Sequence, residues 1–123
     1  MKARDAALRQ KLKFEADDKR RKVEDLEMMI RDFEAMADDL TRQIQAEEDR
    51  TGVRDPSHFA YSTFARSAGQ RREKLASSVA ELQERLAQAV VDRDEALTEL
   101  GDIDPTTKHH RPETLTVSDA YSR

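Results

Sequence analysis

The sequence predicts an all-α protein: a long antiparallel two-helix coiled-coil hairpin with a disordered C-terminal tail. The chain has 123 residues, of which only three are Gly and three are Pro, too few for the turns of a sheet or a barrel. Ala, Glu, Lys, Leu and Arg make up about half of it, a proportion typical of long helices and coiled coils. Apolar residues also recur at heptad spacing in two long stretches, which indicates two helices that pack along one seam.

The first helix is predicted over about residues 5–50. Steps of four and three residues from Leu12 give positions that are apolar in all but two cases, while charged residues fill most of the positions between them. This pattern predicts one buried seam and a solvated outer face. The predicted seam positions are Leu12, Ala16, Lys19, Val23, Leu26, Ile30, Phe33, Ala37, Leu40, Ile44 and Glu47.

A joint over residues 51–60 interrupts the pattern, and a second helix is predicted over about residues 61–101. Gly52 suits the left-handed position that follows a helix, and Asp55-Pro56 suits an N-cap followed by the first helical residue. The second seam comprises Tyr61, Ala65, Ala68, Arg72, Leu75, Val79, Leu82, Leu86, Ala89, Arg93, Ala96, Leu100 and Ile103.

Residues 1–103 are therefore expected to form one helical hairpin. Residues 104–123 contain two Pro, few apolar residues and no periodicity, so a disordered tail is expected there. Each of the two predicted helices is about 65 Å long. The similar lengths of the helices and the short joint between them favour antiparallel packing. A self-associated dimer remains an alternative arrangement.

The register of a fold-back supports the hairpin. Charged seam residues then fall opposite alanines, which leaves room for each cationic side chain to reach water. The expected pairs include Ile44 with Ala65, Leu40 with Ala68, Phe33 with Leu75, Leu12 with Ala96, Lys19 with Ala89, Arg93 with Ala16 and Arg72 with Ala37.

No chemistry-bearing motif is found in the sequence. It has no Cys and no phosphate-binding, zinc-protease or nucleophile-elbow motif, so neither enzymatic activity nor a cofactor is expected. The adjacent His109 and His110 are not expected to form a metal site, because no third ligand is organised beside them. No apolar run is long enough for a membrane span, and no secretory signal is expected.

Nucleic-acid binding is also not expected. The basic cluster Lys19-Arg20-Arg21-Lys22 is interleaved with acidic neighbours, and the sequence pI is about 5.4. A phosphate-binding arm would present a more continuous basic stripe. A nucleic-acid-binding helical arm remains an alternative hypothesis, which predicts binding that weakens steeply as salt rises.

Aromatic residues gather at the joint. Tyr61 falls on the seam, whereas Phe59 and Phe64 either cap the open end of the hairpin or form a docking patch of the kind that makes binding hot spots. Phe14 is expected on the outer face. Two methionines that flank the first seam, Met29 and Met36, are expected to widen the core.

Three features of the sequence occur together: the cluster Lys19-Arg20-Arg21-Lys22 in a long heptad helix, the joint Gly52-Val53-Arg54-Asp55-Pro56-Ser57-His58-Phe59-Ala60-Tyr61, and a second heptad helix of matching length. In this combination the sequence resembles the FliJ family of flagellar export proteins, in its alpha-proteobacterial form. The resemblance covers roughly residues 1–101. The joint is its specific element, and Ser62 departs from the Pro expected there in that group.

The resemblance implies a cytoplasmic coiled-coil stalk, peripheral at the flagellar basal body, that is not itself an enzyme. The implied partners are the hexameric flagellar export ATPase, the export gate membrane protein and export chaperones, with no nucleic acid and no direct membrane insertion. By position along the hairpin, the ATPase end would carry Lys11, Lys13, Arg20 and Arg21, and the joint would present His58, Phe59, Tyr61 and Phe64 to the gate or the chaperones. A stalk or chaperone of a virulence-type secretion system, or a generic coiled-coil scaffold, is the alternative.

Overall fold

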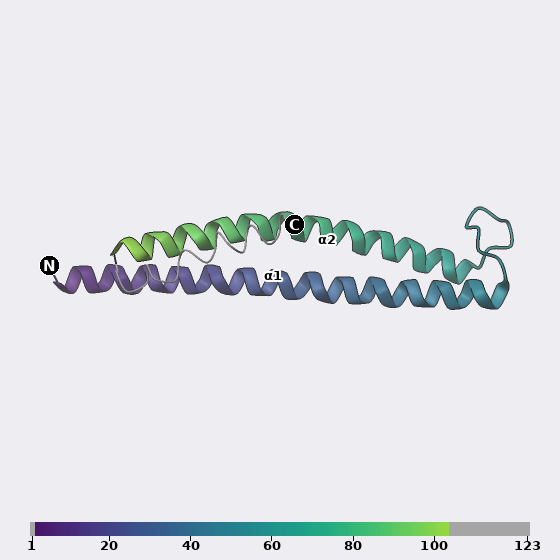
Figure 1. Ribbon diagram of the computed structural model, residues 1–123, viewed down its shortest axis with the longest axis horizontal. Coiled ribbons are helices and arrows are strands. Elements are labelled where there is room, and N and C mark those ends of the chain that lie inside the picture. Colours follow the sequence, from purple (N-terminus) through teal and green to yellow (C-terminus); the bar gives the residue numbers. More distant parts are fainter. Residues whose placement is uncertain (1, 104–123) are drawn as a thin grey trace. The chain divides into compact units, whose positions relative to one another are not determined.

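The computed structural model describes residues 2–103, in which two helices, α1 (Lys2–Thr51) and α2 (Thr63–Ile103), provide all the regular structure (Figure 1). The predicted all-α hairpin is therefore confirmed. Helix α1 begins three residues before its predicted start and ends one residue beyond its predicted end, whereas α2 begins and ends two residues later than predicted. The joint is residues 52–62 rather than 51–60. The predictions for residues 104–123, including His109 and His110, lie outside the described residues.

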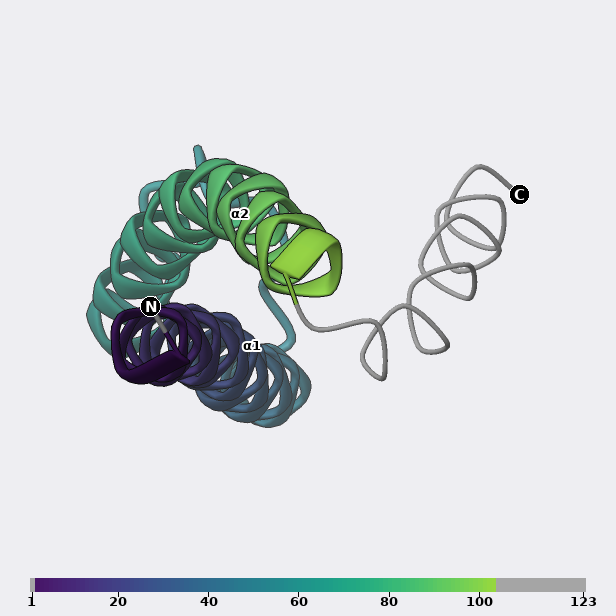
Figure 2. The same cartoon turned by 90° about the vertical axis from the view of Figure 1, so that its left-hand side faces the viewer.

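The described residues divide into two compact units. The loop unit comprises residues 26–85, and the terminal unit comprises residues 2–25 and 86–103. Within each unit a segment of α1 packs against a segment of α2 that runs in the opposite direction, as the two views in Figures 1 and 2 agree.

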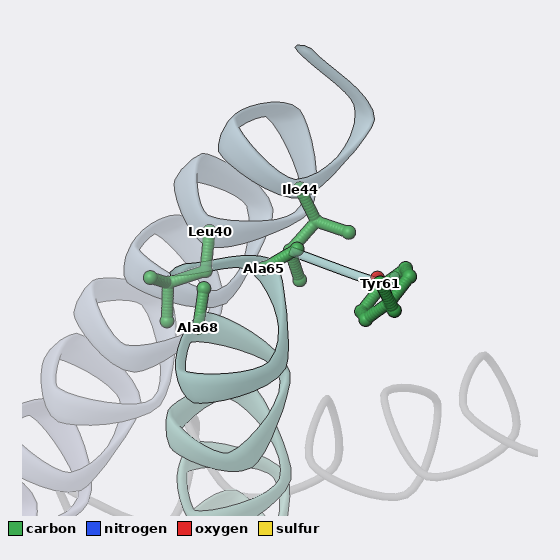
Figure 3. Packing of buried hydrophobic residues seen from close by; sticks show 5 residues of the cluster. All are labelled: Leu40, Ile44, Tyr61, Ala65 and Ala68. Atoms are coloured by element: carbon green, nitrogen blue, oxygen red, sulfur yellow. The ribbon is translucent and has the colours of Figure 1, made fainter. Parts of the chain in front are cut away.

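The heptad seam is withdrawn from solvent as predicted, fully at some positions and partly at others. Every predicted seam position of α1 is buried or half-buried, and so is every one of the second seam except Ile103. In the terminal unit, Leu12 and Ala16 pack with Leu100, and Ala96 lies against them. In the loop unit, the core cluster combines residues of α1, of the joint and of the start of α2 (Figure 3). Its members are Leu40, Ile44, Tyr61, Ala65 and Ala68.

The end of α1 follows the predicted chemistry. Gly52 has a φ of 75°, and its N–H donates a 2.8 Å hydrogen bond to the carbonyl of Glu48. This is the single-bond left-handed helix cap, for which glycine is favoured because it has no Cβ to clash.

Asp55-Pro56 does not start the second helix, contrary to the expectation from its sequence. Asp55 and Pro56 belong to a turn in the joint, and Ser62 is the N-cap of α2. The Ser62 Oγ accepts a 3.2 Å hydrogen bond from the Ala65 N–H, and the Ser62 carbonyl accepts one of 3.0 Å from the Arg66 N–H. Serine is a strong N-cap residue, and it starts the helix where the seam of α2 begins.

The expectation for the methionines was also wrong. Met29 and Met36 are 41% and 51% exposed, so they lie outside the core rather than widening it. A two-helix seam is narrow, and residues adjacent to an a or d position stay partly in solvent when no third element covers them. Phe14 is exposed, as expected.

Candidate functional site

The tip loop, residues 52–62, holds a tight turn. The His58 N–H donates a 3.0 Å hydrogen bond to the Asp55 carbonyl, which closes a four-residue turn. The Asp55 carboxylate accepts hydrogen bonds from the Ser57 N–H at 2.9 Å and the Ser57 hydroxyl at 2.8 Å, and these lower the pKa of Asp55. Asp followed by Pro is typical of such turns, so the same residues that resemble a helix start make a turn instead.

A second turn, over residues 58–61, places Phe59 at the surface. The Tyr61 N–H donates a 3.0 Å hydrogen bond to the His58 carbonyl, and the Ala60 N–H donates one of 3.0 Å to His58 Nδ1. Phe59 lies between His58 and Ala60 in the chain, and its ring stacks on the His58 ring, with ring centroids 4.7 Å apart and planes at 22°. The backbone on both sides of Phe59 is therefore fixed by hydrogen bonds.

Two glutamates at the end of α1 anchor the tip loop. Glu48 Oε2 accepts a 2.7 Å hydrogen bond from the Tyr61 hydroxyl, and Glu47 Oε2 accepts one of 2.5 Å from the Ser62 hydroxyl. Arg50 holds the Glu47 carboxylate with two hydrogen bonds of 2.8 and 2.9 Å. The hydrogen bonds from Arg50 and then from Ser62 lower the pKa of Glu47 to about 2.

Arginines secure the loop from both sides. Arg66 of α2 donates a 2.9 Å hydrogen bond to the Pro56 carbonyl, and its guanidinium lies 5.5 Å from the centre of the Tyr61 ring, a cation–π distance. Arg54, within the loop, pairs with Asp49 of α1. The tip loop is therefore tied to both helices rather than projecting freely.

The exposure of the joint aromatics argues against one of their two interpretations, the cap. Phe59 is 95% exposed and Phe64 is 54% exposed, so neither ring caps the core. Tyr61 is only 7% exposed and belongs to the core cluster, so it supports the loop from below instead of presenting a surface. Of the four residues predicted at the joint, the exposed ones are His58, Phe59 and Phe64.

The four basic residues predicted as the ATPase contact are all exposed and lie on the α1 segment of the terminal unit. Arg20 pairs with Asp17 at 3.2 Å, and Arg21 lies 3.9 Å from Asp18. Lys11 and Lys13 form no ion pair within residues 2–103. Exposed pairs of this kind are weak, so all four cations can reach a partner.

The anchoring role of Glu47 and Glu48 was missed by sequence reasoning. In the sequence pattern Glu47 is only a charged seam position. The signals for its anchoring role are Arg50, three residues later, and the Tyr61-Ser62 pair of the joint, whose hydroxyls can donate to carboxylates.

Within the described part of the chain, no three His, Asp or Glu side chains gather as a metal site would require. In the same residues, no helix is both long and apolar enough to cross a bilayer.

Comparisons of the chain with protein families, curated proteins and solved structures found no match.

Proposed function

We propose that this chain is a non-catalytic coiled-coil stalk of the flagellar type III export apparatus. In this proposal it binds and stimulates the hexameric export ATPase and links that enzyme to the export gate membrane protein and to export chaperones. It would act in the cytoplasm, at the base of the flagellum. The proposal rests on the resemblance of residues 1–101 to the FliJ family and on the form of the tip loop.

The exposed Phe59 on a hydrogen-bonded loop is the single observation that supports a binding role most strongly. A phenyl ring that is 95% exposed contributes little to folding, yet the loop places it at the surface with its backbone fixed on both sides. A preorganised aromatic side chain loses little conformational entropy on binding and is a frequent hot spot. The tip is accordingly the proposed contact for the gate or the chaperones.

The terminal unit is the proposed ATPase end. Its α1 segment carries exposed cationic side chains, including Lys11 and Lys13, that are interleaved with acidic ones. Such a surface allows many weak ionic contacts, each of which can be exchanged between the subunits of a ring. A rotary or shifting contact requires contacts of this strength rather than a large apolar interface.

The experiment is a titration of the flagellar export ATPase with the full chain, following hydrolysis together with the mass of the ATPase assembly. We expect stimulation that accompanies hexamer formation. The variant Lys11→Glu/Lys13→Glu should weaken it, whereas Arg31→Glu/Arg85→Glu, which reverses two exposed charges of the loop unit, should not. Absence of both binding and stimulation would refute the ATPase role.

The tip is tested separately, by binding to the cytoplasmic domain of the export gate protein. Phe59→Ser should abolish this binding. Phe14→Ser is the matched control, since it removes another exposed phenyl ring, 71% exposed, that lies on α1 of the terminal unit. Equal effects of the two substitutions would argue against the tip as the gate contact.

A further inference from the structure

The seam opens in the middle of the loop unit. Between the buried residues Ile30 and Leu40 of α1, no side chain is fully buried, and the same is true between Ala68 and Leu82 of α2. Apolar side chains that would be covered in a three-helix core are therefore left partly in water. The half-buried seam residues of this stretch are Phe33, Ala37, Arg72, Leu75 and Val79.

A groove of about 480 Å³ lies over this opening. Its apolar lining comes from both helices: Phe33, Met36 and Leu40 from α1, and Leu75 from α2. Met36 is half-exposed at its edge, and Met29, one helical turn before Phe33 on the same face, continues the apolar strip along α1. Methionine at such a surface can adapt its shape to an incoming side chain.

The two edges of the groove differ in charge. On the α2 edge, Arg71 and Lys74 are exposed and form no ion pair within residues 2–103. On the α1 edge, Asp39 is already engaged, because its carboxylate lies 3.5 Å from Arg42 and accepts a 2.8 Å hydrogen bond from Gln43. The groove thus combines an apolar floor with two positive charges on one side that form no ion pair within the described residues.

We propose that this groove binds an amphipathic α-helix of a partner protein whose acidic residues run along the side that faces Arg71 and Lys74. The groove extends along α1 from Phe33 to Gln43, a rise of about 15 Å, which matches three turns of a bound helix. The bound helix would supply locally the third layer that the hairpin lacks. Its apolar residues would cover Phe33 and Leu75, and its carboxylates would meet Arg71 and Lys74.

The groove shares no residue with the tip loop or with the basic α1 segment of the terminal unit. Its proposed role does not depend on the proposed export function. The charge of the α2 edge selects the partner. A helix flanked by basic residues would be repelled by Arg71 and Lys74. A purely apolar helix would give these two cations no anionic partner.

The test uses two labelled helical peptides of about four turns. Both carry leucines at alternating spacings of three and four residues. One has glutamates and the other has lysines at the flanking positions. Fluorescence anisotropy with the full chain at low salt should show binding of the glutamate peptide that is about tenfold tighter than that of the lysine peptide.

Two variants assign the binding to the groove. Arg71→Glu/Lys74→Glu should reverse the preference between the peptides, whereas Arg31→Glu/Arg85→Glu should leave it unchanged. Met36→Asp should reduce binding of both peptides at least about tenfold. Met28→Asp is its control, because Met28 is exposed on α1 of the same unit and does not line the groove.

Three results would overturn the proposal: no binding of either peptide, equal binding of both, or a preference that is insensitive to Arg71→Glu/Lys74→Glu. Sedimentation of the free chain supplies a further check. A dimer that Met36→Asp dissociates would assign the groove to a second copy of this chain instead. Because the readout contains no ATPase or gate protein, its failure would leave the proposed export function untouched, and the reverse also holds.

Discussion

The hydroxyl of Tyr61 donates a 2.7 Å hydrogen bond to the Glu48 carboxylate and so joins the tip loop to the last turn of α1. The same tyrosine packs its ring into the core cluster with Ile44 and Ala65. One residue therefore couples the conformation of the loop to the packing of both helices, and this coupling allows the neighbouring Phe59 to stay exposed on a fixed backbone.

We expect Tyr61→Phe to lower the free energy of unfolding by about 1 kcal/mol, because it removes the hydrogen bond and keeps the ring. Urea denaturation followed by circular dichroism measures it. Glu48→Gln retains an acceptor and should cost less. A Tyr61→Phe variant as stable as the wild type would mean that the bond to Glu48 contributes nothing net.

The anchoring of Glu47 predicts an acid dependence. Its pKa is lowered from 4.5 to about 2 by the hydrogen bonds from Arg50 and Ser62, so the native state favours the carboxylate. The stability that these bonds provide is present above about pH 4.5 and is lost as the pH falls from there toward 2. Unfolding measured across this window should depend less on pH in Glu47→Gln. Glu34→Gln, at an exposed site without a hydrogen bond in the described residues, should retain the wild-type profile.

Two glycines make a matched pair with opposite expected effects. At Gly52, where φ is 75°, alanine meets no neighbouring atom but must adopt a left-handed conformation, so Gly52→Ala should destabilise by about 1 kcal/mol. At Gly69, inside α2 with open space around it, Gly69→Ala should stabilise by about 0.5–1 kcal/mol. Thermal unfolding of the two variants compares them directly, and shifts of the same sign would contradict the assigned backbone conformations.

The tip aromatics should separate stability from binding. Phe59→Ser should change the free energy of unfolding by less than about 0.5 kcal/mol, because the ring is exposed. Tyr61→Ala should cost about 3 kcal/mol, since it empties part of the core cluster. Denaturant titrations with helicity as the signal measure both. A large loss in Phe59→Ser would show that its ring is part of the core after all.

Much of the fold could be predicted from the sequence because a coiled-coil seam is a local, repeating pattern. Positions such as Leu12, Leu40 and Leu82 are set by heptad spacing alone, and they are buried as expected. Seam spacing did not determine how residues beside the seam pack. Met29 and Met36 are apolar and adjacent to it, yet a single partner helix does not reach them.

The tip loop was less predictable because it depends on contacts between residues that are not at regular spacing. Asp55-Pro56 suits both a helix start and a turn, and Ser62 competes with it as an N-cap. The bonds from Ser62 to Glu47 and from Tyr61 to Glu48 span 15 and 13 residues, and no periodicity encodes them. The exposure of Phe59 follows from that network, so sequence reasoning could only pose the alternative between a cap and a docking patch.

The fold-back of one chain on itself is the central claim, and a crosslink tests it most directly. Arg72 donates a 3.1 Å hydrogen bond to the Thr41 hydroxyl across the two helices of the loop unit, and both residues are half-buried. Since the chain has no Cys, Thr41→Cys/Arg72→Cys introduces one unique pair for a short bismaleimide reagent. We predict an internally crosslinked product with the mass of one chain, and no crosslinked dimer when the two single-Cys variants are mixed. A two-chain product from that mixture, with little internal crosslink in the double variant, would contradict the hairpin.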